Sequence, residues 1–196
     1  MAGEDRANEA DGDDLRRFQA VYEANYRAIF AYARRRAAST SDAQDAVAET
    51  FTIAWRRLAE IPEAEAARPW LYGVARRVMA NQRRANQRRI DLPARLRGHQ
   101  PASMEFEGQV AAADERRLVL AALGRLRDAD QELLRLAVWE ELPHREIAQI
   151  VGCSESSVAV RLHRARNRLG REIEKGNRGI GQRDMGGHGR RAEGQL

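Results

Sequence analysis

Basic side chains are concentrated on a segment with the spacing of a helix-turn-helix, from Pro143 to Arg168. Gly152 offers a tight turn at little steric cost, and Ser154 can cap the helix that follows. Val158 and Leu162 recur one turn apart and predict the buried stripe of that second helix. Arginine heads reach phosphates and guanine edges, so the segment indicates duplex DNA binding, with a packing corner and solvated arginines as the alternative. The candidate DNA-binding residues on the outer side are Ser157, Arg161, His163, Arg164 and Arg166.

A second basic cluster runs from Arg68 to Arg89, on a predicted helix whose first turn holds Pro69. Aromatic rings beside cations suit an unstacked single strand, because bases stack on rings while arginines follow phosphates. The alternative is that Trp70 belongs to the core and packs against the preceding helix. The candidate single-strand-binding residues are Trp70, Tyr72, Arg76, Arg77, Arg83 and Arg84.

An acidic face is predicted on the helix that begins near Thr40, where Thr40 or Ser41 can act as the cap. Asp42, Asp45 and Glu49 step by three and four residues, so they share one side of this helix. Carboxylates repel DNA, so this face serves either a protein partner or no partner at all. The sequence alone leaves these two alternatives open.

The residue types needed for catalysis or metal binding do not occur in a recognised arrangement. The four histidines are scattered, and there is no HExxH pair, glycine-rich phosphate loop or Ser-His-acid pattern. Cys153 is the only cysteine, which excludes an internal disulfide and an all-cysteine zinc site. We therefore expect no enzyme activity, no cofactor and no metal.

The charge balance points to an anionic partner. The 196 residues carry 34 basic and 29 acidic side chains, and Lys175 is the only lysine. A GC-rich genome would also favour arginine, but the basic residues cluster along helices, which is typical of nucleic-acid-binding proteins.

No apolar run approaches the ~20 residues of a membrane-spanning helix, and the acidic start does not resemble a signal peptide. We expect a reduced, cytoplasmic protein without membrane insertion.

Hydrophobic periodicity predicts an all-α fold of two small helical domains joined by a flexible linker. Helical spacing covers residues 15–89 and returns over residues 114–174. Between them, residues 90–113 lose the periodicity and contain prolines and glycines, which is typical of a linker. We expect residues 1–14 to form a disordered acidic arm and residues 175–196 a disordered tail.

The three pieces, in this order, resemble a bacterial RNA polymerase sigma factor of the extracytoplasmic-function (ECF) type. Residues 15–89 resemble sigma region two, with Asp42 to Trp55 similar to its polymerase-binding helix and Trp70 to Arg89 to its promoter-melting helix. Residues 114–174 resemble sigma region four with its helix-turn-helix. The resemblance implies a protein that binds core RNA polymerase, directs promoter-specific initiation and assists promoter melting.

The resemblance also implies roles for matching residues. Asp45 and Glu49 would contact the clamp helices of the polymerase beta-prime subunit, and the stretch from Trp55 to Trp70 would capture a flipped base of the minus-ten element. Arg161, His163 and Arg164 would face the minus-thirty-five element, with Ser157 near a phosphate. The beta flap is a further implied contact, and the exposed surfaces of both domains are natural targets for an anti-sigma factor.

Two other functions compete with this interpretation. One is a helix-turn-helix regulator that binds duplex DNA without polymerase. The other is a sigma-like decoy that binds polymerase or an anti-sigma factor without initiating transcription.

Overall fold

A computed structural model describes residues 2–90 and 110–185, and over these ranges the chain forms seven α-helices and no strand. The expected all-α fold is confirmed. The contacts between residues divide the chain into two compact units. The first contains helices α1 (Ala2–Arg34), α2 (Thr40–Arg56) and α3 (Ala67–Ile90), together with Arg145–Cys153. The second contains α4 (Val110–Gly124), α5 (Asp128–Val138) and α7 (Glu155–Met185).

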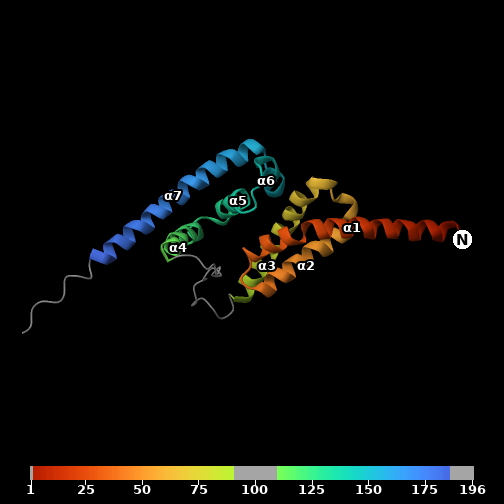
Figure 1. Ribbon diagram of the computed structural model, residues 1–196, viewed down its shortest axis with the longest axis horizontal. Helices are drawn as coiled ribbons and strands as arrows, with labels where there is room; N and C mark the ends of the chain where they lie inside the picture. The colour runs from red at the N-terminus through yellow and green to blue at the C-terminus, as the bar shows by residue number, and fades with distance from the viewer. Residues whose placement is uncertain (1, 91–109, 186–196) are drawn as a thin grey trace, which may run out of the picture. The chain divides into compact units, whose positions relative to one another are not determined.

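Helices α1, α2 and α3 pack against one another in the first unit (Figure 1). Its core holds fully buried apolar side chains from all three helices, among them Ile29, Ala54 and Leu71. The N-cap of α2 is Ser39, whose hydroxyl accepts the Asp42 N–H at 3.0 Å. The predicted caps, Thr40 and Ser41, lie one and two residues too far along the chain, because Ser39 is the residue in the extended conformation that a cap requires.

Aromatic rings line the contact between α1 and α2. Tyr22 lies 4.6 Å from Phe51 and Phe18 lies 5.1 Å from Trp55, centroid to centroid. Such offset and edge-to-face pairs add to the stabilisation that area burial supplies. Trp55 nevertheless stays 45% exposed, so its ring belongs to the surface as well as to this contact.

In the second unit, α4 and α5 lie along the long helix α7 (Figure 1). Gly176 permits a close approach between α7 and α4, since a Cβ atom there would lie 2.5 Å from Cδ1 of Leu118. The first turn of α5 is joined to α7 by an ion pair between Asp130 and Arg168. The N-cap of α5 is Arg127, whose side chain makes no capping hydrogen bond to the helix backbone.

The helices extend further than the sequence predicts. Helix α1 begins at Ala2, so residues 2–14 are helical where an arm was expected; the run contains no proline, and its two glycines are Gly3 and Gly12. Helix α7 continues to Met185, past residue 174, beyond which the tail was expected, and its packing on α4 at Gly176 explains part of the extension. Of the expected linker, residues 91–109 lie outside the described residues, as do residues 186–196 of the expected tail.

Within residues 2–90 and 110–185, two residues in connections adopt positive φ. Gly152 has φ +73°, a conformation that glycine adopts without strain. Glu141, between α5 and α6 (His144–Val151), has φ 52°, which costs a non-glycine residue roughly 1–2 kcal/mol.

Candidate nucleic-acid interface

The turn between α6 and α7 has the local geometry that the sequence predicts. Helix α6 begins directly after Pro143, and its apolar residues Ile147 and Ile150 are buried. The Ala148 carbonyl accepts N–H groups from Gly152 at 2.9 Å and Cys153 at 3.1 Å. These bonds and the left-handed Gly152 end α6 before α7 begins.

Helix α7 begins with a serine cap. The Ser154 hydroxyl accepts the Ser157 N–H at 3.2 Å and lies 2.8 Å from the Ser157 hydroxyl. The predicted apolar stripe is confirmed, because Val158, Leu162 and Ala165 are all buried. The opposite side of α7 is therefore available for a ligand.

The predicted DNA-binding residues of α7 do not all share one face. Arg161 and Arg164 are exposed on the same side as the half-buried Ser157. His163 is exposed, and its Nε2 lies 3.1 Å from the Asn167 amide nitrogen. Arg166 is also exposed, but it lies roughly 160° around the helix from Arg164. A DNA groove that receives Arg161 and Arg164 would not receive Arg166 in the same way.

One single-strand-binding candidate on α3 must be corrected. Tyr72 is only 3% exposed, and its ring packs 5.1 Å from that of Tyr32 on α1. It is therefore a core residue and has no exposed face on which a base could stack. The physical reason is helical geometry, because Trp70 and Tyr72 are about 200° apart around α3.

The remaining candidates on α3 divide into two rows. Trp70, Arg77 and Arg84 are seven residues apart, so they lie in line along one side, about 10 Å between neighbours. Trp70 is half-buried, while the two arginines are exposed. Arg76 and Arg83 form the second row, and Arg83 donates to the Arg36 carbonyl at 3.3 Å.

Arg57, which the sequence did not single out, lies near the Trp70 row. Its guanidinium carbon is 5.8 Å from the centroid of the Trp70 ring, within cation–π distance. Arg57 also forms an ion pair with Glu60, and this hydrogen bond lowers the pKa of the Glu60 carboxyl below its ordinary value. A cation over an indole ring is recognisable only from the structure, since Arg57 and Trp70 belong to different elements.

The acidic side of α2 is presented to solvent. Asp45 and Glu49 are exposed one turn apart, while Asp42 is half-buried near the cap. Among the residues that the structure describes, none forms an ion pair with these three carboxylates that would neutralise them. Trp55 is also exposed, but it lies about 120° around α2 from Glu49 and packs against Phe18 of α1, so it is not part of this acidic side.

The described part of the chain contains neither a metal-binding cluster nor a membrane-spanning helix. Residues 2–90 and 110–185 contain no group of three or more His, Cys, Asp or Glu side chains placed to hold a metal ion. No helix in these ranges is both long and apolar enough to cross a membrane.

Comparison with known proteins identifies both halves of the chain. Residues 21–89 match the family described as sigma-70 region 2, and residues 116–169 match sigma-70 region 4. The chain is 30% identical over 167 residues to the RNA polymerase sigma factor NccH of Alcaligenes xylosoxydans xylosoxydans, covering 82% of this chain and 88% of that one. It is 28% identical over 148 residues to the ECF RNA polymerase sigma factor SigL of Mycobacterium tuberculosis, covering 75% and 83%.

A solved structure has the same fold. The sigma factor RpoE of Bartonella quintana, in complex with the anti-sigma factor NepR, aligns with a TM-score of 0.64 at 22% identity, over 80% of this chain and 96% of that one. The chain belongs to the sigma-70 family of RNA polymerase sigma factors, in its ECF branch. Sigma factors bind core RNA polymerase and direct it to promoters, so the regulator that acts without polymerase is not favoured.

Proposed function

We propose that this sigma factor binds its partners through three surfaces. The acidic side of α2 binds core polymerase, the row formed by Trp70, Arg77 and Arg84 on α3 binds the minus-ten element, and the exposed side of α7 binds the minus-thirty-five element. The observation that carries the proposal is the segregation of charge. The exposed charged residues of α2 are Asp45, Glu49 and Arg56, whereas the exposed charged side chains described on α3 are all arginines and α7 exposes mainly basic side chains, with Glu155 and Glu174 among them. DNA is excluded from the first surface by repulsion and attracted to the other two.

On α2, Asp45 and Glu49 supply the charge that a basic polymerase helix would meet. Both carboxylates are exposed and lie one turn apart on α2. Complementary charges across an interface steer association and fix the orientation of the partners. The beta-prime clamp helices are the proposed contact here, with Asp42 at the edge of the surface.

On α3, Trp70 can stack on an unpaired base while Arg77 and Arg84 follow the backbone of the same strand. The separation of about 10 Å between neighbours in this row exceeds the rise between adjacent nucleotides, so the arginines would meet phosphates further along the strand. Arg76 and Arg83 flank this path. Unstacking costs a few kcal/mol per step, which stacking and phosphate contacts offset.

On α7, Arg161 and Arg164 are the proposed readers of the duplex, with Ser157 near a phosphate and His163 at the edge. A recognition helix reads base edges in the major groove with residues near its N-terminus. These four residues lie within the first three turns of α7. The Arg166 side chain points elsewhere and is not required for this contact.

The chain itself carries out no bond-breaking step in this proposal, because the polymerase performs the chemistry. We expect the protein to act in the cytoplasm, where its polymerase partner works. The structural relative from Bartonella quintana is bound to an anti-sigma factor. That complex supports the proposal that exposed surfaces of this chain take such a partner, with the beta flap as a further polymerase contact for the second unit.

The test of the α2 surface is binding to core polymerase in the absence of DNA. The variant Asp45→Arg/Glu49→Arg should lose binding by at least tenfold, because it places cations against a basic partner. The control Glu63→Arg/Glu65→Arg changes the charge of the same unit equally at exposed positions outside α2. Equal binding by the two variants would contradict the proposal.

A further inference from the structure

A row of cations continues along α7 well past the part that resembles a recognition helix. Its members follow one another at spacings of three and four residues, the repeat that keeps side chains on one side of a helix. The row spans about 25 Å of helix. The family match to region 4 ends at residue 169, so the last three members lie beyond it. The row consists of Arg161, Arg164, Arg168, Arg171, Lys175 and Arg178.

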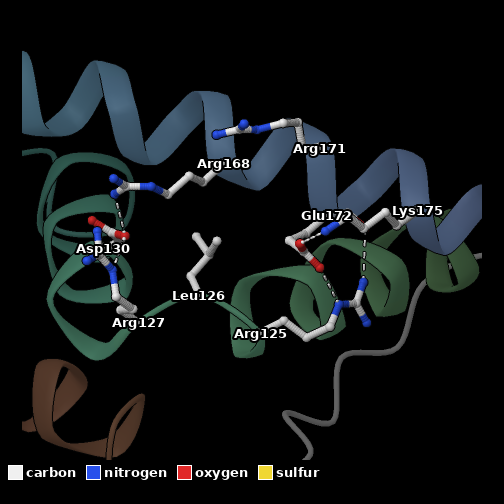
Figure 2. A pocket seen from close by; sticks show the side chains of 8 residues that line it. All are labelled: Arg125, Leu126, Arg127, Asp130, Arg168, Arg171, Glu172 and Lys175. Atoms are coloured by element: carbon white, nitrogen blue, oxygen red, sulfur yellow. Dashed lines mark hydrogen bonds and ion pairs between the residues drawn. The ribbon is translucent and has the colours of Figure 1, made fainter.

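The middle of this row opens into a hollow of about 340 Å³ in the second unit (Figure 2). Two more arginines reach it from the connection between α4 and α5, and Leu126 lies between the two groups of charges. The lining carries five cations, Arg125, Arg127, Arg168, Arg171 and Lys175, against two carboxylates, Asp130 and Glu172. The hollow is therefore strongly positive.

The two carboxylates hold cations in place and offset only part of their charge. Asp130 accepts from Arg168 at 2.8 Å and from Arg127 at 3.4 Å. Glu172 accepts from Lys175 at 2.7 Å and from Arg125 at 3.0 Å. The hydrogen bonds from Lys175 and then Arg125 lower the pKa of Glu172, so it stays ionised at neutral pH. Each carboxylate thus positions two cations, which fixes the donors before a ligand arrives.

Arg171 differs from its neighbours in the hollow. Its side chain is exposed, and it forms no ion pair with a described residue. In Figure 2 it projects from α7 on the opposite side of the hollow from Arg125 and Arg127. A guanidinium with unused donors at the rim of a positive hollow is suited to a phosphate oxygen.

We propose that this hollow and the distal row bind backbone phosphates of duplex DNA, so that α7 holds the duplex beyond the bases it reads. This inference rests on the proposed contact between α7 and the duplex. Each strand of duplex DNA carries one phosphate per about 3.4 Å of axis, a spacing comparable with the 4.5–6 Å between neighbours in the row, so several members can meet phosphates where α7 runs beside a strand. The contact adds affinity and no sequence preference.

The experiment measures binding of the full chain to a random-sequence duplex over a range of salt concentrations. The variant Arg171→Ala/Lys175→Ala/Arg178→Ala should lower the slope of log K against log salt by about 2 to 3, since each phosphate contact contributes about 0.9. The control Arg27→Ala/Arg34→Ala/Arg56→Ala removes the same charge from exposed positions of the first unit. The slope for this control should stay closer to that of the unchanged chain than the slope for the distal triple variant does.

A second variant guards against a folding defect. Arg171→Gln removes a side chain without an ion pair to any described residue, and it should lower the slope by about 0.9. An unchanged slope in both distal variants would overturn the inference. Loss of binding in Arg161→Ala/Arg164→Ala, together with unchanged distal variants, would leave the proposed function standing and remove only the inference. If none of these variants lowers binding, both fail.

The same hollow offers its donors to a free polyphosphate, which the experiment separates from DNA. Calorimetry with inorganic tripolyphosphate, in the absence of DNA, reports whether a free anion binds. Tripolyphosphate binding that is lost in the distal triple variant, with an unchanged DNA slope, would assign the site to a free anion and overturn the DNA contact.

Discussion

Arg168 Nη1 lies 2.8 Å from Oδ2 of Asp130, and this contact joins the middle of α7 to the first turn of α5. Asp130 is only 6% exposed, so its carboxylate depends on protein donors more than on water. Arg127 supplies a second, longer contact of 3.4 Å from the residue that precedes α5. The pair sets the position of the helix that carries the proposed DNA-reading side chains.

Replacing Arg168 should destabilise the second unit. Arg168→Ala leaves a buried carboxylate with Arg127 alone, and an uncompensated buried charge costs several kcal/mol at most. We expect the protection of α5 and α7 amides from hydrogen exchange to fall by about 1–3 kcal/mol. The exposed Arg161→Ala should leave protection unchanged. Equal protection in Arg168→Ala and the unchanged chain would show that the pair contributes nothing.

The two positive-φ residues should respond in opposite directions. Gly152→Ala should lower the free energy of unfolding by about 1–2 kcal/mol, because alanine is strained at φ +73° although open space surrounds its Cβ. Glu141→Gly should raise it by up to about 1 kcal/mol by relieving the strain at φ 52°. Thermal unfolding followed by circular dichroism measures both, and a stabilising Gly152→Ala would contradict the assigned geometry.

Stability of the second unit should depend on acid through Glu172. Its pKa is lowered in the folded state by hydrogen bonds from Lys175 and Arg125. The stabilisation is therefore complete above the unfolded-state pKa of about 4.3 and is lost as the pH falls through the lower folded-state pKa. The melting temperature of Glu172→Gln should fall less than that of the unchanged chain between about pH 5 and 3. Parallel curves would contradict this assignment.

Trp70 and Tyr72 should behave differently in single-strand binding. Trp70→Ala should weaken binding to a single-stranded oligonucleotide by about 1–3 kcal/mol, the range measured for loss of one base stack. Tyr72→Phe should leave this binding unchanged, because the ring lies in the core against Tyr32. Fluorescence anisotropy measures both affinities. Loss of binding in Tyr72→Phe alone would reverse the roles given to these two rings.

The turns, helix caps and apolar stripes of the fold can be predicted from the sequence because they depend on residues close together in the chain. Gly152, Ser154 and the stripe of Val158 and Leu162 have the roles that residue type and spacing predict. The cap of α2 falls at Ser39 rather than Thr40 or Ser41, since several adjacent hydroxyl residues can cap and only tertiary packing selects one.

Features that depend on contacts between distant elements were not predictable in this way. Trp70 and Tyr72 look alike as aromatic residues beside arginines, and only helical phase and the position of Tyr32 place Tyr72 in the core. The continuation of α7 past Lys175 depends on Leu118 of α4, which packs where Gly176 has no side chain. The hollow between Arg125 and Arg171 likewise joins segments that are separated by more than forty residues.

Run-off transcription with purified core polymerase and fragmented genomic DNA tests the central claim most directly. New discrete start sites that appear only when this protein is added are the predicted result, and their upstream sequences should share two elements at constant spacing. The Asp45→Arg/Glu49→Arg variant should produce none of these transcripts. Binding to core polymerase without any new start site, under the same conditions, would contradict the account and identify the chain as a decoy.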